Sequence, residues 1–356
     1  NGAGIQKKAD ELIEVKYILD VRDFPDSPFA QHFVKDFSVI EHDPEVNVVV
    51  ETIGGVGAAL DFTERALKQG KSVVTSNKEL VATHGRRLLD LAAQNNAVYL
   101  FEASVGGGIP ILHPLTQCMA ANRVDEIYGI LNGTTNFILT KMVKEGASFA
   151  EALKLAQEKG YAEADPTADV ERIDAGRKIC ILADLAFGHQ VDPAQVPMEG
   201  ITGIDLKDVE IAGRHGYRIK LLGRCLRLEG DRRTAYVAPH LIPMDNPISD
   251  VNDVFNAVVV RGNATGEVMF YGKGAGELPT ASAVVADVME CILEDRPRPE
   301  IGWSADTGGF ASPLTLKNRL PSDPREMDDK EFRRMRDNAE GIQFSHSMEE
   351  QIGGQL

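Results

Sequence analysis

The stretch GYAEADPTADVERIDAGRK, residues 160–178, is rich in side chains that can take part in proton chemistry. Its acidic residues include Glu163, Asp165, Asp169 and Asp174, and Lys178 follows them. Asp174 and Lys178 are four residues apart, so on a helix they share one face. The predicted helix is apolar at Ile181 and Leu182, and an ammonium buried beside carboxylates can be held in place and act as a proton donor. An ordinary surface ion pair at this spacing is the alternative.

Two further stretches place polar groups where a predicted strand gives way to a helix. In TSNKELVA, Asn77 and Lys78 follow a short β-branched strand, at the edge where doubly wound sheets bind ligands. In ILNGTTNFIL, the helix start at Gly133 and Thr134 could hold a carboxylate through its backbone N–H groups. Plain helix capping is the alternative interpretation at both positions.

Glycines gather in two other segments. EASVGGGIPI carries Gly106–Gly108 between a strand and a helix-like run, a pattern typical of a phosphate cradle, although dinucleotide sites normally open at the first strand. YGKGAGELPTASAV leads into a helix and could either close over a cofactor or serve as a hinge between domains. Together these stretches indicate a nicotinamide enzyme that acts on a small, charged, amino-acid-like carbonyl compound.

The elements that must position these groups divide the chain into two parts. Residues 1–104 alternate between β-branched runs and amphipathic runs, with strands expected at 47–55, 71–77 and 97–104. This alternation predicts an α/β fold with a Rossmann-like, doubly wound nucleotide-binding domain. The opening strand and its Gly-x-Gly-x-x-Gly turn are not recognisable in the chain as given, and we expect them to precede residue 1.

The second part changes in character. Residues 105–277 combine helices with strand-like runs at 217–230, 234–243 and 256–272, which predicts an α+β domain for substrate binding, catalysis and dimerisation. A helix at 278–293 is expected to return to the first domain. Residues 294–356 are predicted to form a C-terminal extension with one charged helix. The open sheet invites pairing with a second copy, so we expect a homodimer.

Composition excludes several classes of partner. The net charge of −16 over 356 residues argues against nucleic acid and against anionic membrane surfaces. The four cysteines show no metal-ligand spacing, and three lie in apolar runs, which is typical of buried free thiols in a reducing cytoplasm. We therefore expect a cytoplasmic enzyme with a small-molecule substrate.

At these residues the sequence resembles homoserine dehydrogenase. SNKELVA, EASVGGGIPI, LNGTTNFIL, GYAEADPTADVERIDAGRK and YGKGAGELPTASAV occur in that family's order and spacing, from about Val15 to about Val288. The resemblance implies reduction of L-aspartate 4-semialdehyde to L-homoserine with NADPH or NADH, on the route to threonine, methionine and isoleucine. It implies that Lys178 is the catalytic acid and base, with Asp174 and Lys78 also in the catalytic site.

The resemblance also implies binding roles for further residues. Substrate would be bound by Glu163, Asp169, Asp174, Gly133 and Thr134. The cofactor would be bound by Arg22, Thr52, Ser76, Asn77, Lys78, Gly276 and Glu277. A monovalent cation, usually sodium, would be held by the backbone carbonyls of Glu102, Val105, Gly107 and Ile109; carbonyl oxygens suit a hard cation, and glycines let them converge.

Asp20 and Arg22 bear on the choice between NAD and NADP, and the C-terminal region bears on regulation. Asp20, at the end of a predicted strand, could accept from a ribose 2′-OH and favour NAD, whereas Arg22 could pair with a 2′-phosphate. Because the family often has an arginine here, we expect NADP, with NAD possible. Arg172 replaces the family's glycine, and the family's common C-terminal regulatory domain is not recognisable.

Two rival functions remain open at this point. One is another two-domain semialdehyde or oxo-acid dehydrogenase, which would often need a catalytic cysteine. No cysteine lies on a predicted active-site turn. The other is a catalytically silent relative, which the retained Glu163, Asp174 and Lys178 set argues against.

Overall fold

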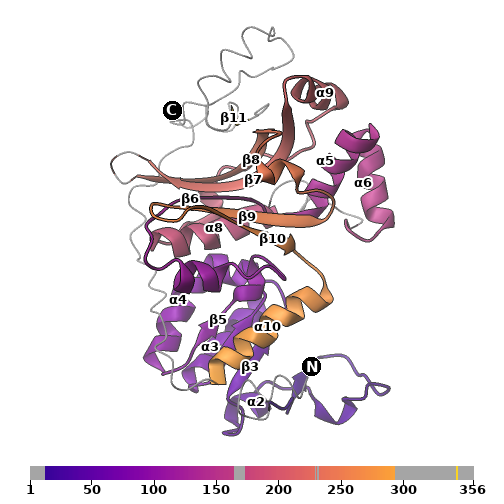
Figure 1. Cartoon of the computed structure of the whole chain (residues 1–356). Helices are drawn as coiled ribbons and strands as arrows, with labels where there is room; N and C mark the ends of the chain where they lie inside the picture. The colour runs from indigo at the N-terminus through magenta and orange to yellow at the C-terminus, as the bar shows by residue number, and fades with distance from the viewer. Residues whose placement is uncertain (1–12, 164–172, 229, 231, 293–341, 344–356) are drawn as a thin grey trace. The chain divides into compact units, whose positions relative to one another are not determined.

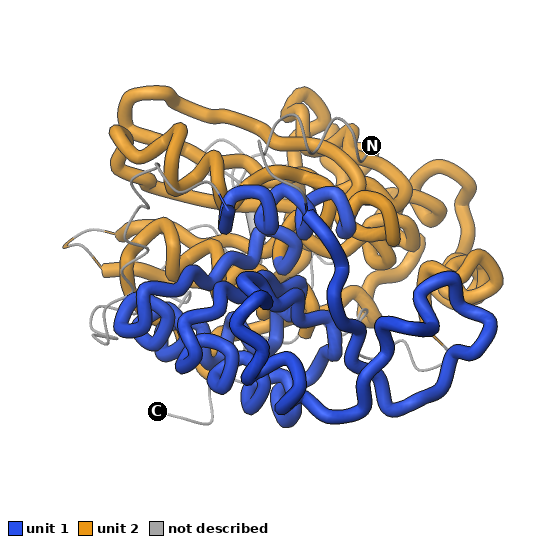
Figure 2. The backbone as a smooth tube through the Cα atoms, turned by 90° about the horizontal axis from the view of Figure 1, so that it is seen from below, with its two compact units in different colours: residues 1–104, 280–302 blue, residues 105–279, 303–356 orange. Residues whose placement is uncertain are grey.

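The computed structural model describes residues 13–163, 173–228, 230, 232–292 and 342–343. The chain divides into two compact units, coloured separately in Figure 2. Unit 1 comprises residues 1–104 and 280–302, and unit 2 comprises residues 105–279 and 303–356. The chain therefore passes into unit 2 after Ser104 and returns to unit 1 at Thr280.

Unit 1 is built on a three-stranded parallel sheet. Its strands are β3 (Val48–Glu51), β4 (Ser72–Thr75) and β5 (Tyr99–Leu100), in the order β3-β4-β5. β4 is the central strand and is buried along its whole length, as expected for a parallel strand covered on both faces. The strand expected at 97–104 is shorter than predicted, because the chain turns into a 3-10 helix, η2 (Glu102–Ser104).

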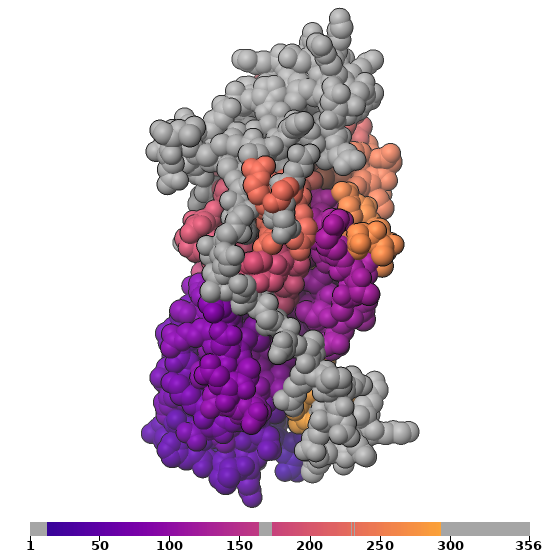
Figure 3. Space-filling view, turned by 90° about the vertical axis from the view of Figure 1, so that its left-hand side faces the viewer, coloured from indigo at the N-terminus to yellow at the C-terminus, as the bar shows by residue number. Residues whose placement is uncertain are grey.

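Three helices accompany this sheet. α3 (Gly57–Lys68) and α4 (Lys78–Gln94) are the crossover connections, and they pack against each other. Figure 3 views the molecule from the side on which α4 lies in Figure 1, with this part of the chain in purple. α10 (Glu277–Ile292) contributes its residues from Thr280 onward to unit 1. It is anchored there by Asp287, whose carboxylate accepts a hydrogen bond from the backbone N–H of Glu102 at 2.9 Å.

The segment before β3 forms smaller elements. β1 (Ile18–Leu19) and β2 (Phe33–Val34) pair in parallel as a separate two-stranded sheet. A 3-10 helix, η1 (Ala30–His32), lies between β1 and β2, and the short helix α2 (Ser38–His42) follows β2. β1 is the strand predicted to end at Asp20, and it ends one residue earlier, at Leu19.

Unit 2 is built on a six-stranded antiparallel sheet in the order β10-β9-β6-β7-β8-β11. The strands are β6 (Val124–Ile130), β7 (Tyr217–Arg227), β8 (Arg233–Pro243), β9 (Phe255–Gly262), β10 (Gly266–Lys273) and β11 (Ile342–Gln343). β7 and β8 pair along their full length. β11 comes from the C-terminal extension and pairs with β8 at Leu241 and His240.

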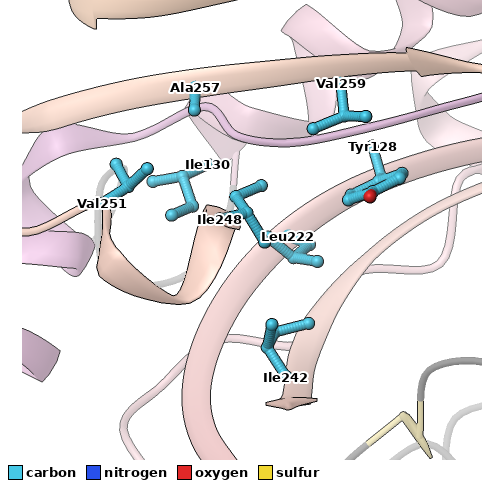
Figure 4. Close-up of a cluster of buried hydrophobic side chains, with 8 residues drawn as sticks. All are labelled: Tyr128, Ile130, Leu222, Ile242, Ile248, Val251, Ala257 and Val259. Carbon is cyan, nitrogen blue, oxygen red and sulfur yellow. The ribbon is translucent and has the colours of Figure 1, made fainter. Parts of the chain in front are cut away.

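Alternation along these strands separates two faces of the sheet. One face carries an apolar cluster, drawn in Figure 4, that includes Tyr128, Ile130 and Val259 from β6 and β9. Ile248 of the 3-10 helix η6 (Pro247–Asp250) and Val251 complete one end of it. These side chains share a face because strand residues two apart point the same way.

Helices cover the opposite face. α8 (Ile173–Phe187) packs on β6, β7 and β8. Its close approach depends on Gly223, where an added Cβ would lie 3.2 Å from the Cβ of Ile179. The other helices among the described residues of unit 2 are α5 (Gly133–Glu145), α6 (Phe149–Glu158) and α9 (Leu206–Arg214), with a π-helical turn η3 (Pro114–Cys118) and a 3-10 turn η4 (Pro193–Gln195).

Some predicted features fall outside the described residues: the start of the long helix predicted over residues 165–188, Asp169, Arg172 and the charged helix near the C-terminus. Within the described part of the chain, no helix has the length and apolar character needed to cross a membrane.

Candidate active site

A buried lysine forms the centre of the candidate site in unit 2. Lys178 lies on α8, and its side chain is only 9% exposed. Its Nζ donates to the Oδ2 of Asp174 at 2.8 Å and to the backbone carbonyl of Leu131 at 2.8 Å. An ammonium has three N–H donors, so among described residues one N–H of Lys178 remains for a further acceptor. The surface-pair alternative is thus wrong for Asp174 and Lys178.

The helix start of α5 joins this pair. Asn132 caps α5, and its Oδ1 accepts from the backbone N–H of Thr135 at 2.8 Å. The other end of the same amide, Nδ2, donates to the Oδ2 of Asp174 at 3.1 Å. One side chain therefore fixes both the first turn of α5 and the carboxylate that holds Lys178.

Two of the predicted substrate residues, Gly133 and Thr134, form the start of α5 itself. Gly133 is the first residue of α5, and an added Cβ would lie 2.8 Å from the carbonyl oxygen of Val254, so glycine is required there by close packing. Thr134 is buried, and its hydroxyl donates to the carbonyl of Tyr161 at 2.6 Å. Glu163 is exposed.

In unit 1, four of the predicted cofactor residues lie at the carboxyl ends of β3 and β4, namely Thr52, Ser76, Asn77 and Lys78. Asn77 is the N-cap of α4: its Oδ1 accepts from the N–H of Leu80 at 3.1 Å, and its Nδ2 donates to the carbonyl of Gly55 at 2.6 Å. Ser76 and Lys78 are partly exposed on either side, and Thr52 is exposed. The capping interpretation is thus correct for Asn77, and the same cap ties together the two loops of this edge.

A residue not singled out from the sequence shapes the same edge. Glu51 is buried at the end of β3, and its carboxylate accepts from the hydroxyl of Thr75 at 2.6 Å and the N–H of Ile53 at 2.7 Å. Gly54 and Gly55 both have positive φ, at 81° and 65°. The turn after β3 is therefore held by internal hydrogen bonds with its backbone exposed to a ligand.

Asp20 and Arg22, which the sequence presents as alternative ribose contacts, pair with each other. The guanidinium of Arg22 donates to both carboxylate oxygens of Asp20, at 3.1 and 2.9 Å. These hydrogen bonds from Arg22 lower the pKa of Asp20 to about 2. Arg22 itself is exposed.

The two glycine-rich segments of unit 2 meet each other. The N–H of Gly108 donates to the carbonyl of Lys273 at 3.1 Å. Gly107 has φ of 58°, and an added Cβ would lie 2.4 Å from the carbonyl oxygen of Gly274. The triplet is thus a point of close backbone approach between the two segments. Gly276, with φ of 122°, and Glu277 at the start of α10 are both exposed.

For the proposed cation, Glu102 belongs to unit 1, whereas Val105, Gly107 and Ile109 belong to unit 2. The glycine turn of unit 2 is compatible with carbonyl ligands, because it has no Cβ at Gly107. Among described residues, no group of three or more histidine, cysteine or acidic side chains is arranged to hold a metal.

The cysteines contribute no nucleophile to this site. Cys180, Cys225 and Cys291 are buried free thiols, and Cys118 is exposed on η3. Burial raises the pKa of Cys180 and of Cys225 well above the usual thiol value, which disfavours the reactive thiolate. The thiol-dependent rival therefore loses its main requirement.

Fold and site together define a class. Unit 1 has parallel strands with polar caps and glycine turns at their carboxyl edge, and unit 2 has an antiparallel sheet whose helices hold a buried lysine–carboxylate pair. This is the arrangement of a two-domain α/β protein in which a doubly wound unit of the nucleotide-binding kind is joined to a unit built on an antiparallel sheet.

Comparison with known families identifies the family within this class. Residues 110–289 match the family model for homoserine dehydrogenase, and residues 5–102 match the model for the homoserine dehydrogenase NAD-binding domain. The chain belongs to the homoserine dehydrogenase family. The Rossmann-like first domain predicted from the sequence is confirmed by this match.

Individual members of this family are similar to the chain in sequence over most of its length. The chain is 46% identical to homoserine dehydrogenase of Bacillus subtilis over 288 residues, covering 81% of this chain and 65% of that one. It is 42% identical to the Pseudomonas aeruginosa enzyme over 301 residues, covering 84% and 69%. The chain thus spans 65% and 60% of the Bacillus and Synechocystis relatives.

Solved structures are similar as well. A homoserine dehydrogenase from Thiobacillus denitrificans superposes with a TM-score of 0.81 at 38% identity, covering 87% of this chain and 74% of that one. A hyperthermophilic archaeal homoserine dehydrogenase mutant in complex with NADPH superposes with a TM-score of 0.60 at 32% identity, covering 70% and 72%.

Proposed function

We propose that the protein reduces L-aspartate 4-semialdehyde to L-homoserine, reversibly, in the cytoplasmic biosynthesis of threonine, methionine and isoleucine. The observation that carries this proposal is the buried Lys178, held by Asp174 and the carbonyl of Leu131. Family membership supplies the reaction, and the lysine supplies the proton that the reaction requires.

The chemistry assigns a role to each held group. When bound, NADPH or NADH supplies a hydride to the aldehyde carbon. Negative charge then develops on the aldehyde oxygen, and the third N–H of Lys178 donates a proton to it. Asp174 and Asn132 keep the ammonium oriented, so little reorganisation is needed during proton transfer. General acid catalysis of this kind contributes typically ~10²–10⁴-fold.

Substrate binding is assigned to the start of α5 and to the acidic stretch before α8. Backbone N–H groups of Gly133 and Thr134 are the unpaired donors of a helix N-terminus and would hold the substrate carboxylate. Glu163, with Asp169, would bind the substrate ammonium. Lys78 would lie near both the nicotinamide and the substrate.

For the cofactor, we assign contacts to Arg22 after β1, to the carboxyl edge of the three-stranded parallel sheet and to the start of α10. The residues are Arg22, Thr52, Ser76, Asn77, Lys78, Gly276 and Glu277. Because Arg22 is exposed and its partner Asp20 is anionic, a 2′-phosphate would have to compete with that carboxylate. We assign NADP as the favoured cofactor, with NAD also used.

Two further assignments complete the proposal. Sodium or a similar monovalent cation would be bound by the carbonyls of Glu102, Val105, Gly107 and Ile109. The protein would act as a homodimer, which is supported by the large antiparallel sheet of unit 2.

The direct test is oxidation of NADPH and of NADH in the presence of L-aspartate 4-semialdehyde. Lys178→Ala is expected to abolish turnover while the circular dichroism spectrum stays that of the parent protein. Near-normal kcat in this variant would show that the proton comes from elsewhere. Arg22→Ala should lower kcat/KM for NADPH more than for NADH; equal loss with both cofactors would remove Arg22 from phosphate recognition.

A further inference from the structure

A buried acceptor without a partner lies beside the start of α5. Asn256, in β9, is 3% exposed, and its Oδ1 has no hydrogen-bond partner among the residues described. Leaving a buried acceptor unpaired costs about 1–3 kcal/mol, and buried polar groups in folded proteins are otherwise nearly always paired. An unpaired one therefore requires a reason.

The side chain of Asn256 is enclosed by two glycines. A Cβ added to Gly274 would lie 2.0 Å from its Nδ2, and a Cβ added to Gly133 would lie 3.5 Å from its Oδ1. The carboxamide therefore occupies the space left by the absent side chain of Gly274, where its oxygen would lie 2.7 Å from the added Cβ, and the same oxygen also borders Gly133 at the start of α5. All three residues belong to unit 2.

The backbone that carries Asn256 is fixed. Asn136 of α5 donates from Nδ2 to the carbonyls of Val251, Asp253 and Phe255, at 3.1, 3.0 and 3.1 Å. Its Oδ1 accepts from the buried ammonium of Lys220 at 3.0 Å. The segment leading into β9 is thus bound to α5, and the unpaired oxygen is held in place before any ligand arrives.

Charge decides which ligand group suits this oxygen. The start of α5 offers N–H donors and a positive dipole end, which favour a carboxylate. An acceptor next to those donors suits a positively charged N–H group, and a free α-amino acid presents a carboxylate and an ammonium on one carbon. The carbonyl of Leu131 binds Lys178, and Leu131 precedes Gly133 by two Cα spacings, at most about 7.6 Å. This spacing is similar to the length of a four-carbon amino acid.

We propose that Asn256 is a substrate-specificity residue, whose Oδ1 accepts a hydrogen bond from the α-ammonium of the amino-acid substrate. The proposal rests on the proposed function, because the substrate is taken to be L-aspartate 4-semialdehyde or L-homoserine. It adds a neutral acceptor, fixed by α5 and β9, to the exposed carboxylate of Glu163. Its effect is to select compounds that carry an amino group over their des-amino analogues.

The test pairs a protein change with a ligand change. Binding of L-homoserine and of 4-hydroxybutyrate, which has the same chain without the ammonium, is measured by calorimetry with NADP⁺ present. Asn256→Ala should weaken L-homoserine binding on the order of 10- to 100-fold, the range for a hydrogen bond to a charged group. The same variant should leave 4-hydroxybutyrate binding unchanged.

Two further variants separate recognition from structure. Asn256→Asp keeps an acceptor at the same position and should bind L-homoserine within a few-fold of the parent protein. Asn263→Ala removes an exposed asparagine of the turn after β9, which caps the N–H of Arg123, and should change neither ligand. In unliganded Asn256→Ala, relief of the unpaired buried acceptor, worth about 1–3 kcal/mol, should offset the lost packing against Gly274, so the melting temperature should stay near that of the parent.

The outcomes are distinct. Equal weakening of both ligands, unchanged binding of L-homoserine, or a shift confined to NADPH affinity would each overturn the role of Asn256. A fall in melting temperature in both Asn256→Ala and Asn256→Asp, with both ligands lost, would show a purely structural role. Failure of the parent protein to bind L-homoserine or to oxidise NADPH would overturn the proposed function and this inference with it, whereas an active parent and an unaffected variant would overturn the inference alone.

Discussion

The ion pair between Lys178 and Asp174 makes a stability prediction that is separate from turnover. The two side chains are 9% and 11% exposed, and their charged atoms are 2.8 Å apart. At an effective dielectric constant of about 20, two unit charges at this distance attract by roughly 6 kcal/mol. Desolvation offsets much of this attraction, but removing one partner of a buried pair typically costs about 3–5 kcal/mol.

The perturbation is a double-mutant cycle of Lys178→Met and Asp174→Asn. Lys178→Met leaves a buried carboxylate that keeps its hydrogen bond from Asn132, so we expect a loss of about 3–4 kcal/mol. Asp174→Asn should cost less, about 1–3 kcal/mol, because Leu131 still accepts from Lys178. The double variant should be more stable than the sum predicts, by about 1.5 kcal/mol or more.

The assay is urea unfolding followed by far-ultraviolet circular dichroism at neutral pH. The control is the same cycle at Lys154 and Glu158, which share the four-residue spacing on α6 but are 78% and 59% exposed. Exposed pairs at this spacing couple by about 0.3–0.5 kcal/mol. Additivity at Lys178 and Asp174 within about 0.5 kcal/mol, equal to the control, would refute a buried, mutually dependent pair.

Three other perturbations test the frame around the site. Gly107→Ala combines a left-handed φ with a Cβ 2.4 Å from the carbonyl oxygen of Gly274, whereas Gly146→Ala has a similar φ in open space. In urea unfolding, Gly146→Ala should lower the free energy of unfolding by about 1–2 kcal/mol, and Gly107→Ala should lower it distinctly more. Equal losses in the two variants would contradict the close contact at Gly107. Burial lowers the pKa of Lys220 to about 7 from 10.5, so above pH 7 the unfolded chain keeps a proton that the folded chain has lost. Stability should therefore rise between pH 8 and 10 by up to about 1.4 kcal/mol per pH unit relative to Lys220→Met, and parallel profiles would show that the ammonium is not desolvated. Burial raises the pKa of Asp287 to about 8 from 3.8, so stability should fall between pH 5 and 8 in the parent relative to Asp287→Asn, and an unchanged slope would count against that burial.

Much of unit 1 follows from local pattern alone. The runs at 48–51 and 72–75 form parallel strands as expected. Only β4, the central strand, is buried along its whole length, as expected for a parallel strand covered on both faces. The sequence pattern gives no such signal for the segment that returns to unit 1 late in the chain, where α10 joins this unit from Thr280 onward. The hydrogen bond that Asp287 accepts from the backbone N–H of Glu102 links positions that no local period connects.

The candidate site was partly predictable. The spacing of Asp174 and Lys178 predicted a shared helix face, yet it could not decide between a surface pair and a buried one, since burial depends on packing of α8 against the sheet. Asn132 could have been found from the sequence, because asparagine before Gly-Thr-Thr is a helix-cap pattern. Its second bond, to Asp174, could not, because it joins two helices.

Asn256 and Glu51 show where sequence reasoning stops. Each lies in or at the end of an apolar strand, where a polar residue gives no periodic signal. Glu51 becomes recognisable only through its partners Thr75 and Ile53. Asn256 becomes recognisable only through the absence of a partner for its Oδ1 among described residues.

The contact between Gly107 and Gly274 has an evolutionary and engineering consequence. Two segments far apart in the sequence meet backbone to backbone, so neither can gain a side chain unless the other moves. They should therefore be inherited as a matched pair, and a chimaera that takes one segment from a relative with a larger residue at either position would need the other segment from the same parent. Recombination libraries of this family should keep both segments from one source.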